Sequence, residues 1–481
     1  MQPTSSSPTS MEMMNPPAAA LGSEDMLAVS EKLAGWTGPT VWGEFAALAA
    51  ETKAVNLGQG FPNWDPPQFV VDAAHHAIEK GFHQYTRTSG HQRLVDLLAR
   101  RYTQHLRREV DANNEVAVTV GASQALFVAL QVLVKPGDEV ILLEPFFDLY
   151  VGQIRLAGGV PKFVPLVVQD EEWVLDADLL KKAVGPRTKV IMMNTPHNPT
   201  GKVFTRDEMD AVAEVVRQNP QLSVISDEVY KYIVHSEDAP APQCILPPNL
   251  GGPSYDSGED QSPQTWLADE DEEEEVLSPS GHIHFAKLPG MWDRTITVSS
   301  AGKTFSVTGW QVGWIVAAKH FTKEAQLMLP FLQFCAATPM QEALVEVIEA
   351  ADRPYRDCLS YYDWMRKEYT EKREYLKKGL ISAGIKPMRA EGGFFLMGDI
   401  SDIDFPSKYM ADSTPAMPKM TRDWAFCRYL AKEEGVVAIP SAPFFSAKNR
   451  YMGSNYVRFA FCKKEETLEQ AIEKLKMLKL K

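Results

Sequence analysis

The chain has 481 residues, of which 44% are hydrophobic and 23% are charged, and its formal net charge at pH 7 is −14. This length predicts one large domain or two closely packed ones, and the composition is that of a globular protein rather than a disordered or fibrous one. The acidic balance disfavours nucleic acids and anionic membranes as partners and favours small-molecule substrates.

The N-terminal leader, residues 1–35, is predicted to be disordered. Its first 30 residues are rich in Ser, Pro, Met and Ala, with three acidic residues and no arginine, which is unlike a transit peptide. The chain has no apolar run long enough to cross a bilayer. The five cysteines lie far apart without a CxxC pair, which favours a reducing compartment. We therefore expect a cytoplasmic protein, with a mitochondrial fraction left open.

Short apolar runs alternate with helical patterns between about residues 115 and 318. β-branched runs predict strands at 116–120, 140–143, 160–165, 190–193, 222–225, 295–298 and 312–317, each apolar enough to be covered on both faces. Helical spacing recurs at Leu126, Leu130 and Leu133, and Thr205 is placed to cap a helix that ends near residue 218. This order predicts a doubly wound α/β domain with a mostly parallel sheet.

The segment from residue 236 to about 290 interrupts this alternation with Pro, Gly, Ser and an acidic run at 269–275. Its composition predicts a polar surface excursion. His282 and His284 at its end suggest a metal site, but the polar flanks favour solvated side chains, so we propose no metal. After residue 320 the pattern becomes helical, and an apolar stripe at Leu468, Ile472, Leu475 and Leu478 predicts a final amphipathic helix.

We therefore expect four parts. They are the leader, an N-terminal segment at 36–75 that packs on the smaller domain, a large domain at 76–325 with an acidic insertion at 236–286, and a smaller α/β domain at 326–481.

Lys303 ends the motif SAGK, which directly follows the predicted strand 295–298. Ligands of open α/β sheets bind at the carboxyl ends of the strands, and a desolvated amine there has a lowered pKa and can bond covalently with a carbonyl group. Taken alone, a lysine at such a position is more often a solvated loop residue.

Polar motifs follow two neighbouring strands. Asp227 could keep the ring nitrogen of a pyridine cofactor protonated, while Asn198 and Tyr230 could donate to a ring oxygen. The simpler alternatives are a turn at Asn198 and a helix cap at Asp227.

Three further features could bind anions or a ring. Ala122 and Ser123 lie in a strand-to-helix turn whose amides suit a phosphate, with Ser300 as an added hydroxyl, although small residues there also allow tight packing. Phe147 could lie on the pyridine ring or in the core. Arg458, in an alternating strand at 455–461, could clamp a carboxylate or form a surface salt bridge.

Together these motifs resemble the fold-type I pyridoxal 5'-phosphate (PLP) enzymes, the class I and II aminotransferases. Within them the chain looks most like the kynurenine aminotransferases, also called glutamine transaminase K or cysteine-S-conjugate β-lyase. The strings NLGQGFP at 56–62, EPFFD at 144–148, LPGMW at 288–292 and SAGKTF at 300–305 carry this resemblance, which covers roughly residues 38–480.

The resemblance implies a role for each candidate residue. Lys303 would hold PLP covalently and move the proton at Cα, and Asp227 would pair with the ring nitrogen. The other cofactor contacts would come from Asn198, Tyr230, Phe147, Ala122, Ser123, Ser300 and, from a neighbouring subunit, Tyr85. Arg458 would bind the substrate carboxylate with Gly60 and Asn198, while Trp42 would wall the side-chain pocket.

The implied protein is a homodimer with shared active sites. It would transfer amino groups from kynurenine, glutamine and aromatic or large neutral amino acids to 2-oxo acids. Cysteine-conjugate β-elimination, another aminotransferase specificity (aromatic or methionine) and a non-catalytic binding protein on the same scaffold are the alternatives.

Three departures from the family pattern affect these expectations. Gln311, eight residues after Lys303, stands where the family usually has a phosphate-binding Lys or Arg. Ser123 stands where some kynurenine aminotransferases have a tyrosine, and Cys335 lies near where some have a histidine.

Overall fold

The computed structural model describes residues 40–235 and 281–480. The predicted leader and the acidic run at 269–275 lie outside these described residues. The described residues form one unit by their contacts, and the finer division into a large domain at 76–325 and a smaller one at 326–481 stays a prediction.

A seven-stranded sheet forms the centre of the fold. Its strands are β2 (Val116–Val120), β3 (Glu139–Glu144), β4 (Val160–Pro165), β7 (Thr188–Asn194), β8 (Ser223–Asp227), β9 (Thr295–Ser300) and β10 (Val312–Ala317). The spatial order is β2-β10-β9-β8-β7-β3-β4, and β10 alone runs antiparallel to its neighbours. All seven strands were predicted from the sequence, with ends within two residues of those observed. The α/β fold with a mostly parallel sheet is therefore confirmed.

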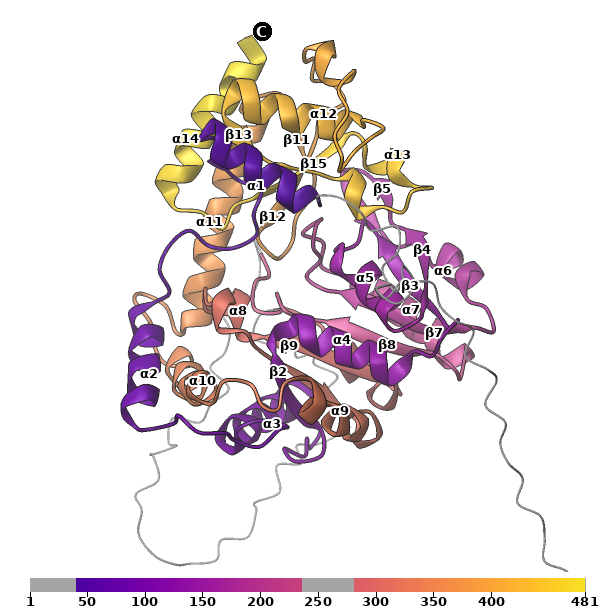
Figure 1. The fold of residues 1–481 in the computed structure, drawn as a ribbon, viewed down its shortest axis with the longest axis vertical. Helices are drawn as coiled ribbons and strands as arrows, with labels where there is room; N and C mark the ends of the chain where they lie inside the picture. The colour runs from indigo at the N-terminus through magenta and orange to yellow at the C-terminus, as the bar shows by residue number, and fades with distance from the viewer. Residues whose placement is uncertain (1–39, 236–280, 481) are drawn as a thin grey trace, which may run out of the picture. The chain divides into compact units, whose positions relative to one another are not determined.

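Helices cover both faces of this sheet. On β7, Ile191 and Met193 join a core cluster that includes residues of α3 (Gln92–Leu106), α7 (Arg206–Gln218) and α10 (Thr338–Ala351). Val190 and Met192 join a second cluster formed with α4 (Gly121–Leu133), α5 (Leu149–Leu156) and α9 (Lys319–Leu332). Figure 1 shows α4 lying over β8 and β9. Because successive side chains of a strand point to opposite faces, these wholly apolar strands are buried on both sides.

The predicted helix after Thr205 is confirmed as α7. Thr205 Oγ1 accepts a hydrogen bond from Glu208 N at 3.2 Å, and Glu208 Oε2 accepts one from Thr205 N at 2.9 Å. This reciprocal pair satisfies two amides that the first helical turn leaves unpaired. The remaining elements outside the C-terminal part are α2 (Gln68–Glu79), β5 (Val167–Gln169), β6 (Glu172–Val174), α6 (Ala177–Ala183) and α8 (Ala301–Thr304).

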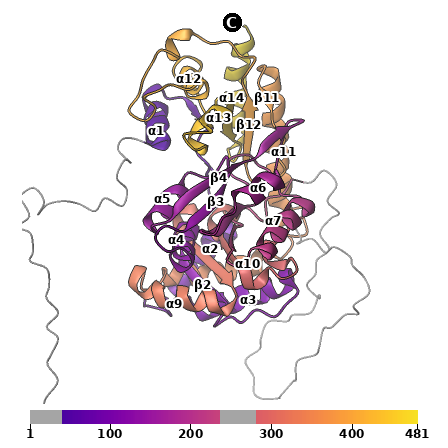
Figure 2. The same cartoon turned by 90° about the vertical axis from the view of Figure 1, so that its right-hand side faces the viewer.

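The C-terminal part builds a second, antiparallel sheet. Its order is β11 (Lys386–Pro387), β12 (Phe395–Asp399), β15 (Tyr456–Ala460) and β14 (Ile439–Pro440). Helices α11 (Tyr361–Ser382) and α14 (Glu465–Lys476) lie side by side (Figure 2), where a Cβ on Gly379 would come within 2.4 Å of Ile472 Cγ1. Leu468, Ile472 and Leu475 of the predicted stripe are buried in α14, and Leu478 is buried in the 3₁₀ turn that follows.

The N-terminal helix α1 (Val41–Thr52) packs on C-terminal elements, as Figure 1 shows. The Phe45 ring lies 5.6 Å from that of Trp424 in α12 (Arg422–Tyr429), and Glu44 pairs with Arg428 at 2.6 Å. Strand β1 (Val55–Asn56) then pairs in parallel with β13 (Val436–Val437). These contacts position the segment after β1, residues 57–61, between the two sheets. The short helix α13 (Arg450–Gly453) precedes β15.

Two sequence-based expectations are wrong. His282 and His284 are not solvated but 1% and 2% exposed, because the segment that follows residue 280 packs against Tyr102 and His105 of α3. Strand β15 was expected to alternate, but four of its five residues are buried, since it is the central partner of β12 and β14. Among the described helices, none combines the length and apolarity needed to cross a bilayer.

Candidate active site

A cavity of about 420 Å³ opens at the carboxyl ends of β7, β8 and β9. The start of α4 forms one wall. The opposite side is closed by residues from four places: α1, the segment after β1, β12 and β15. It contains every predicted site residue except Tyr85. The lining comprises Trp42, Gln59, Gly60, Phe61, Gly121, Ala122, Ser123, Leu126, Phe147, Leu149, Tyr150, Asn194, Asn198, Asp227, Val229, Tyr230, Ser300, Gly302, Lys303, Thr308, Gln311, Val312, Phe395 and Arg458.

Lys303 projects into this cavity from α8, the single turn that follows β9. Its Nζ donates to Gly60 O at 2.9 Å. Burial lowers the pKa of the Lys303 amine to about 8, because a charged ammonium group loses hydration in the cavity. The solvated-loop alternative is therefore wrong, and about a tenth of this amine is uncharged and nucleophilic at pH 7.

Asp227 ends β8 and is 4% exposed. Its Oδ2 accepts a hydrogen bond from the Tyr150 hydroxyl at 2.7 Å, and its Oδ1 accepts one from Val229 N at 3.3 Å. Burial raises the pKa of this carboxyl to about 6, so it is an anion at neutral pH whose charge is only partly compensated. A protonated ring nitrogen in the cavity would supply the missing positive charge.

Arg458 lies in β15 and is 1% exposed, so the surface salt-bridge alternative is wrong. Its two terminal nitrogens donate to Asn198 Oδ1 and Gly58 O, each at 2.8 Å, while Nε is buried without a hydrogen-bond partner. Burial lowers the pKa of the guanidinium to about 10, which leaves it charged at neutral pH. No carboxylate of residues 40–235 or 281–480 forms an ion pair with it, so the site is suited to an incoming anion.

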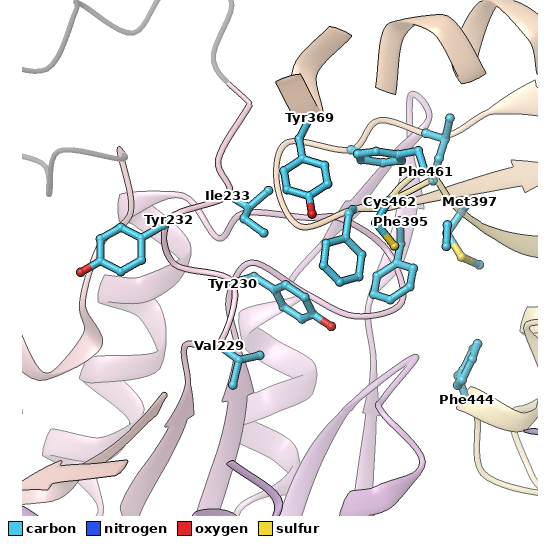
Figure 3. Packing of buried hydrophobic residues seen from close by; sticks show 14 of the residues in the cluster. Val229, Tyr230, Tyr232, Ile233, Tyr369, Phe395, Met397, Phe444, Phe461 and Cys462 are labelled. Carbon is cyan, nitrogen blue, oxygen red and sulfur yellow. The ribbon is translucent and has the colours of Figure 1, made fainter. Parts of the chain in front are cut away.

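Aromatic side chains surround the guanidinium of Arg458. Its Cζ lies 4.0 Å from the Phe395 ring centroid and 5.0 Å from that of Trp42, whose Nε1 donates to Asp148 Oδ2 at 2.7 Å. Figure 3 shows Tyr230, from the loop after β8, beside Phe395 of β12, with ring centroids 6.1 Å apart. The wall next to the Arg458 guanidinium is therefore apolar and flat.

Tyr85 is the predicted site residue that this single chain does not bring into the cavity. It is 78% exposed, and its ring lies 4.5 Å from that of Phe334. Among the lining residues that sequence analysis did not name, Tyr150, Asn194 and Phe395 contact predicted site residues. Asn194 is the last residue of β7 and donates to Asp227 O at 3.0 Å, so its position at a strand end was an available signal.

Comparison with known proteins assigns the family. The model for aminotransferase class I and II matches residues 52–475. The chain belongs to this family. It is 39% identical over 458 residues to kynurenine–oxoglutarate transaminase of Dictyostelium discoideum, covering 92% of this chain and 94% of the relative. It is 37% identical over 450 residues to human kynurenine–oxoglutarate transaminase 1, covering 91% and 96%.

A solved structure supports the same assignment. Bna3p from Saccharomyces cerevisiae, a candidate kynurenine aminotransferase, is 30% identical and superposes with a TM-score of 0.80 over 94% of this chain and 99% of that one. The protein is thus an aminotransferase with the fold-type I architecture.

In this aminotransferase the backbone at the start of α4 forms a cradle that lines the cavity. The helix has no side-chain cap, so the amides of its first turn, including those of Ala122 and Ser123, stay free to bind an anion beside Ser300. Gly121 adopts a φ of +70°, and a Cβ there would come within 2.6 Å of Gln311 Oε1. Gln311 therefore borders the cradle, and the described lining supplies only Lys303 and Arg458 as cationic side chains.

Proposed function

We propose that the protein is a PLP-dependent aminotransferase that acts on kynurenine, glutamine and aromatic or large neutral amino acids, with 2-oxo acids as acceptors. The observation that carries this proposal is the combination of an amine of lowered pKa, Lys303, with an unpaired buried guanidinium, Arg458, in one cavity. The first suits covalent attachment of an aldehyde, and the second suits capture of an amino acid carboxylate.

The cavity fits the proposed cofactor at each of its polar groups. Asp227 would pair with the ring nitrogen, Asn198 and Tyr230 would donate to the 3'-oxygen, Phe147 would lie against the ring, and Ala122, Ser123 and Ser300 would hold the phosphate. The bound coenzyme supplies an electron sink for the bond breaking at Cα. Lys303 would then move the proton to and from Cα, because its amine is held in the cavity by Gly60 O and is partly uncharged at neutral pH.

The substrate preference is inferred from the wall around Arg458. Trp42 and Phe395 offer flat apolar surfaces to a substrate side chain, and the described lining has no second arginine or free lysine for an acidic one. Large neutral or aromatic side chains would thus be favoured over acidic ones. Relatives named as kynurenine–oxoglutarate transaminases, at 37–39% identity, point the same way.

A screen of amino donors tests this proposal. Purified protein with PLP and a 2-oxo acid should convert kynurenine, which cyclises to kynurenic acid, and should use glutamine and phenylalanine in preference to aspartate. A preference for aspartate would contradict the assigned specificity. Release of pyruvate and ammonia from a cysteine conjugate would identify β-lyase activity, and no turnover of any donor would leave only the binding-protein alternative.

Gln311 is expected to weaken retention of the cofactor phosphate, because the described cradle lacks a charge-assisted hydrogen bond worth about 1.5–3 kcal/mol. We predict that Gln311→Lys tightens PLP binding to the apoenzyme by about 10- to 100-fold. Fluorescence quenching during PLP titration measures this affinity. Gln311→Met is the uncharged control and should not tighten binding. If Gln311→Lys binds PLP no more tightly than the wild type, another group compensates and this explanation fails.

Cofactor uptake should depend on pH through Lys303. Its pKa is lowered to about 8, and only the neutral amine can attack the aldehyde. The rate constant for PLP uptake by the apoenzyme should therefore rise about tenfold per pH unit below that value and level off above it. Stopped-flow absorbance from about pH 6.5 to about pH 9.5 measures the profile. A rate that continues to rise above pH 9 would show an amine of ordinary pKa instead.

We also propose that the protein is a homodimer with shared active sites. Phe334, whose ring lies 4.5 Å from that of Tyr85, is 53% exposed, and α9 just before it carries two more exposed apolar side chains, Phe331 at 88% and Leu327 at 58% exposure. Adjacent exposed aromatic residues mark an association surface. Phe331→Asp should shift the sedimentation coefficient from dimer to monomer and weaken PLP binding, while Ile381→Asp, at an exposed position on α11, should change neither. A monomeric wild type would refute this proposal.

A further inference from the structure

A second cluster of polar side chains lies outside the cavity. Glu228 follows Asp227 at the end of β8, but it belongs to a group with His282 and His284 on the segment that follows residue 280. All three are buried, with exposed fractions of 0%, 1% and 2%. None of them lines the cavity of the candidate active site.

The three side chains present one ligand atom each to a common point. Glu228 Oε2 lies 2.5 Å from His284 Nδ1 and 3.3 Å from His282 Nε2, and all three ligand atoms lie within 4.8 Å of one another. Ligands bound tetrahedrally to zinc at about 2.0–2.1 Å stand about 3.3 Å apart. Changes of up to about 1.5 Å in these separations would therefore place an ion at bonding distance from all three.

The hydrogen bonds of this cluster are incomplete without an ion. Neither nitrogen of His282 has a hydrogen-bond partner, although Nε2 faces Glu228, and His284 Nε2 is also buried without a partner. Buried polar atoms in native proteins are almost always paired, so such a concentration of orphaned imidazole nitrogens beside one carboxylate requires an explanation. A cation between them would satisfy His282 Nε2 directly.

We propose that Glu228, His282 and His284 bind one borderline divalent cation of the zinc type. Two imidazoles and a carboxylate select such ions over magnesium or calcium, which prefer oxygen ligands alone. A buried water molecule would complete four-coordination. This proposal revises the expectation, drawn from the sequence, that the two histidines bind no metal.

The surroundings of the cluster are compatible with a cation. Ser226 Oγ donates to Glu228 Oε1 at 2.9 Å, which orients the carboxylate and leaves Oε2 directed at the two histidines. The His105 ring stacks on His284 with centroids 5.1 Å apart. Lys231 is a nearby basic group, and its Nζ donates to the Tyr102 hydroxyl at 2.7 Å.

The site would have a structural role. His282 lies 54 residues after Glu228 in the chain, so the ion would link two distant parts of the sequence at the carboxyl end of β8. Links that close long loops remove more freedom from the unfolded chain than those that close short ones. The same link would fix the end of β8, where Glu228 N donates to Val298 O at 2.8 Å, one residue from Asp227.

Metal analysis of the intact holoenzyme tests this inference. Tag-free protein, expressed with zinc in the medium and dialysed against a weak chelator, should contain about one equivalent of metal by inductively coupled plasma mass spectrometry. His282→Ala and His284→Ala should each retain at least about tenfold less. His235→Ala is the matched control, because His235 is a buried histidine outside the cluster and should leave the metal content unchanged.

The wild-type content alone decides the matter if the alanine variants do not fold. A wild-type protein with less than about 0.1 equivalents of any transition metal would overturn the proposal. A folded His282→Ala variant that contains as much metal as the wild type would also overturn it. Growth with cobalt provides a second measurement, since tetrahedral cobalt with nitrogen ligands absorbs in the visible range. Absence of such absorption in protein that has bound cobalt would likewise place the ion elsewhere.

Discussion

Lys303→Ala is expected to lower kcat/KM for amino donors by at least about a thousandfold. The substitution removes the amine that follows the carboxyl end of β9. This amine would both hold the cofactor and move the proton at Cα. No other lysine lines the described cavity, so no side chain there can take over either role. Steady-state kinetics with phenylalanine or kynurenine and a 2-oxo acid measure the loss.

Two further variants separate the chemistry from folding. Lys303→Arg keeps the charge but cannot form the covalent bond, and it should be as inactive as Lys303→Ala. Lys202→Met removes a buried lysine outside the cavity, which pairs with Glu208 at 2.8 Å, and should keep the activity per folded molecule. Activity of Lys303→Ala at the wild-type rate would refute the proposed role.

Arg458→Lys should have the second largest effect on activity. Truncating one member of a buried charge pair costs about 2–5 kcal/mol, which corresponds to a loss of roughly 30- to 5,000-fold in kcat/KM. A lysine would keep the positive charge, but it cannot contact Asn198 and Gly58 while also presenting a planar fork to a carboxylate. The loss is measured with phenylalanine as donor.

The specific readout for Arg458 is discrimination between donors with and without a carboxylate. The wild type should prefer phenylalanine to phenethylamine by a large factor, and Arg458→Lys should reduce that ratio. Arg422→Lys is the matched control, since Arg422 binds backbone carbonyls away from the cavity. An unchanged ratio in Arg458→Lys would assign the carboxylate to another group.

The central sheet could be predicted from the sequence because its strands are short and continuously apolar. A strand buried on both faces needs no alternation, and all seven such runs became sheet strands. The convergence of Lys303, Asp227 and Asn198 also followed, since parallel strands end at one edge. Arg458 could be named as a candidate, but its burial between β12 and β14 depends on pairing across the chain.

Other features depend on tertiary contacts that no local pattern reveals. The polar flanks of His282 and His284 suggested solvent exposure, yet both are buried, and His284 packs against α3, about 180 residues earlier in the sequence. Tyr150 was not named from the sequence, because its contact with Asp227 depends on how α5 packs over the sheet. Tyr85 is exposed and does not line the cavity of its own chain, so its predicted role rests on the proposed dimer.

Borohydride trapping tests the central claim most directly. Tag-free protein is incubated with PLP, reduced with borohydride, digested and mapped by mass spectrometry. We expect the added mass of the reduced coenzyme at Lys303, with loss of the visible absorbance band. Labelling at a different lysine, such as Lys463, or the absence of any labelled peptide from protein that had been incubated with PLP would contradict the assignment.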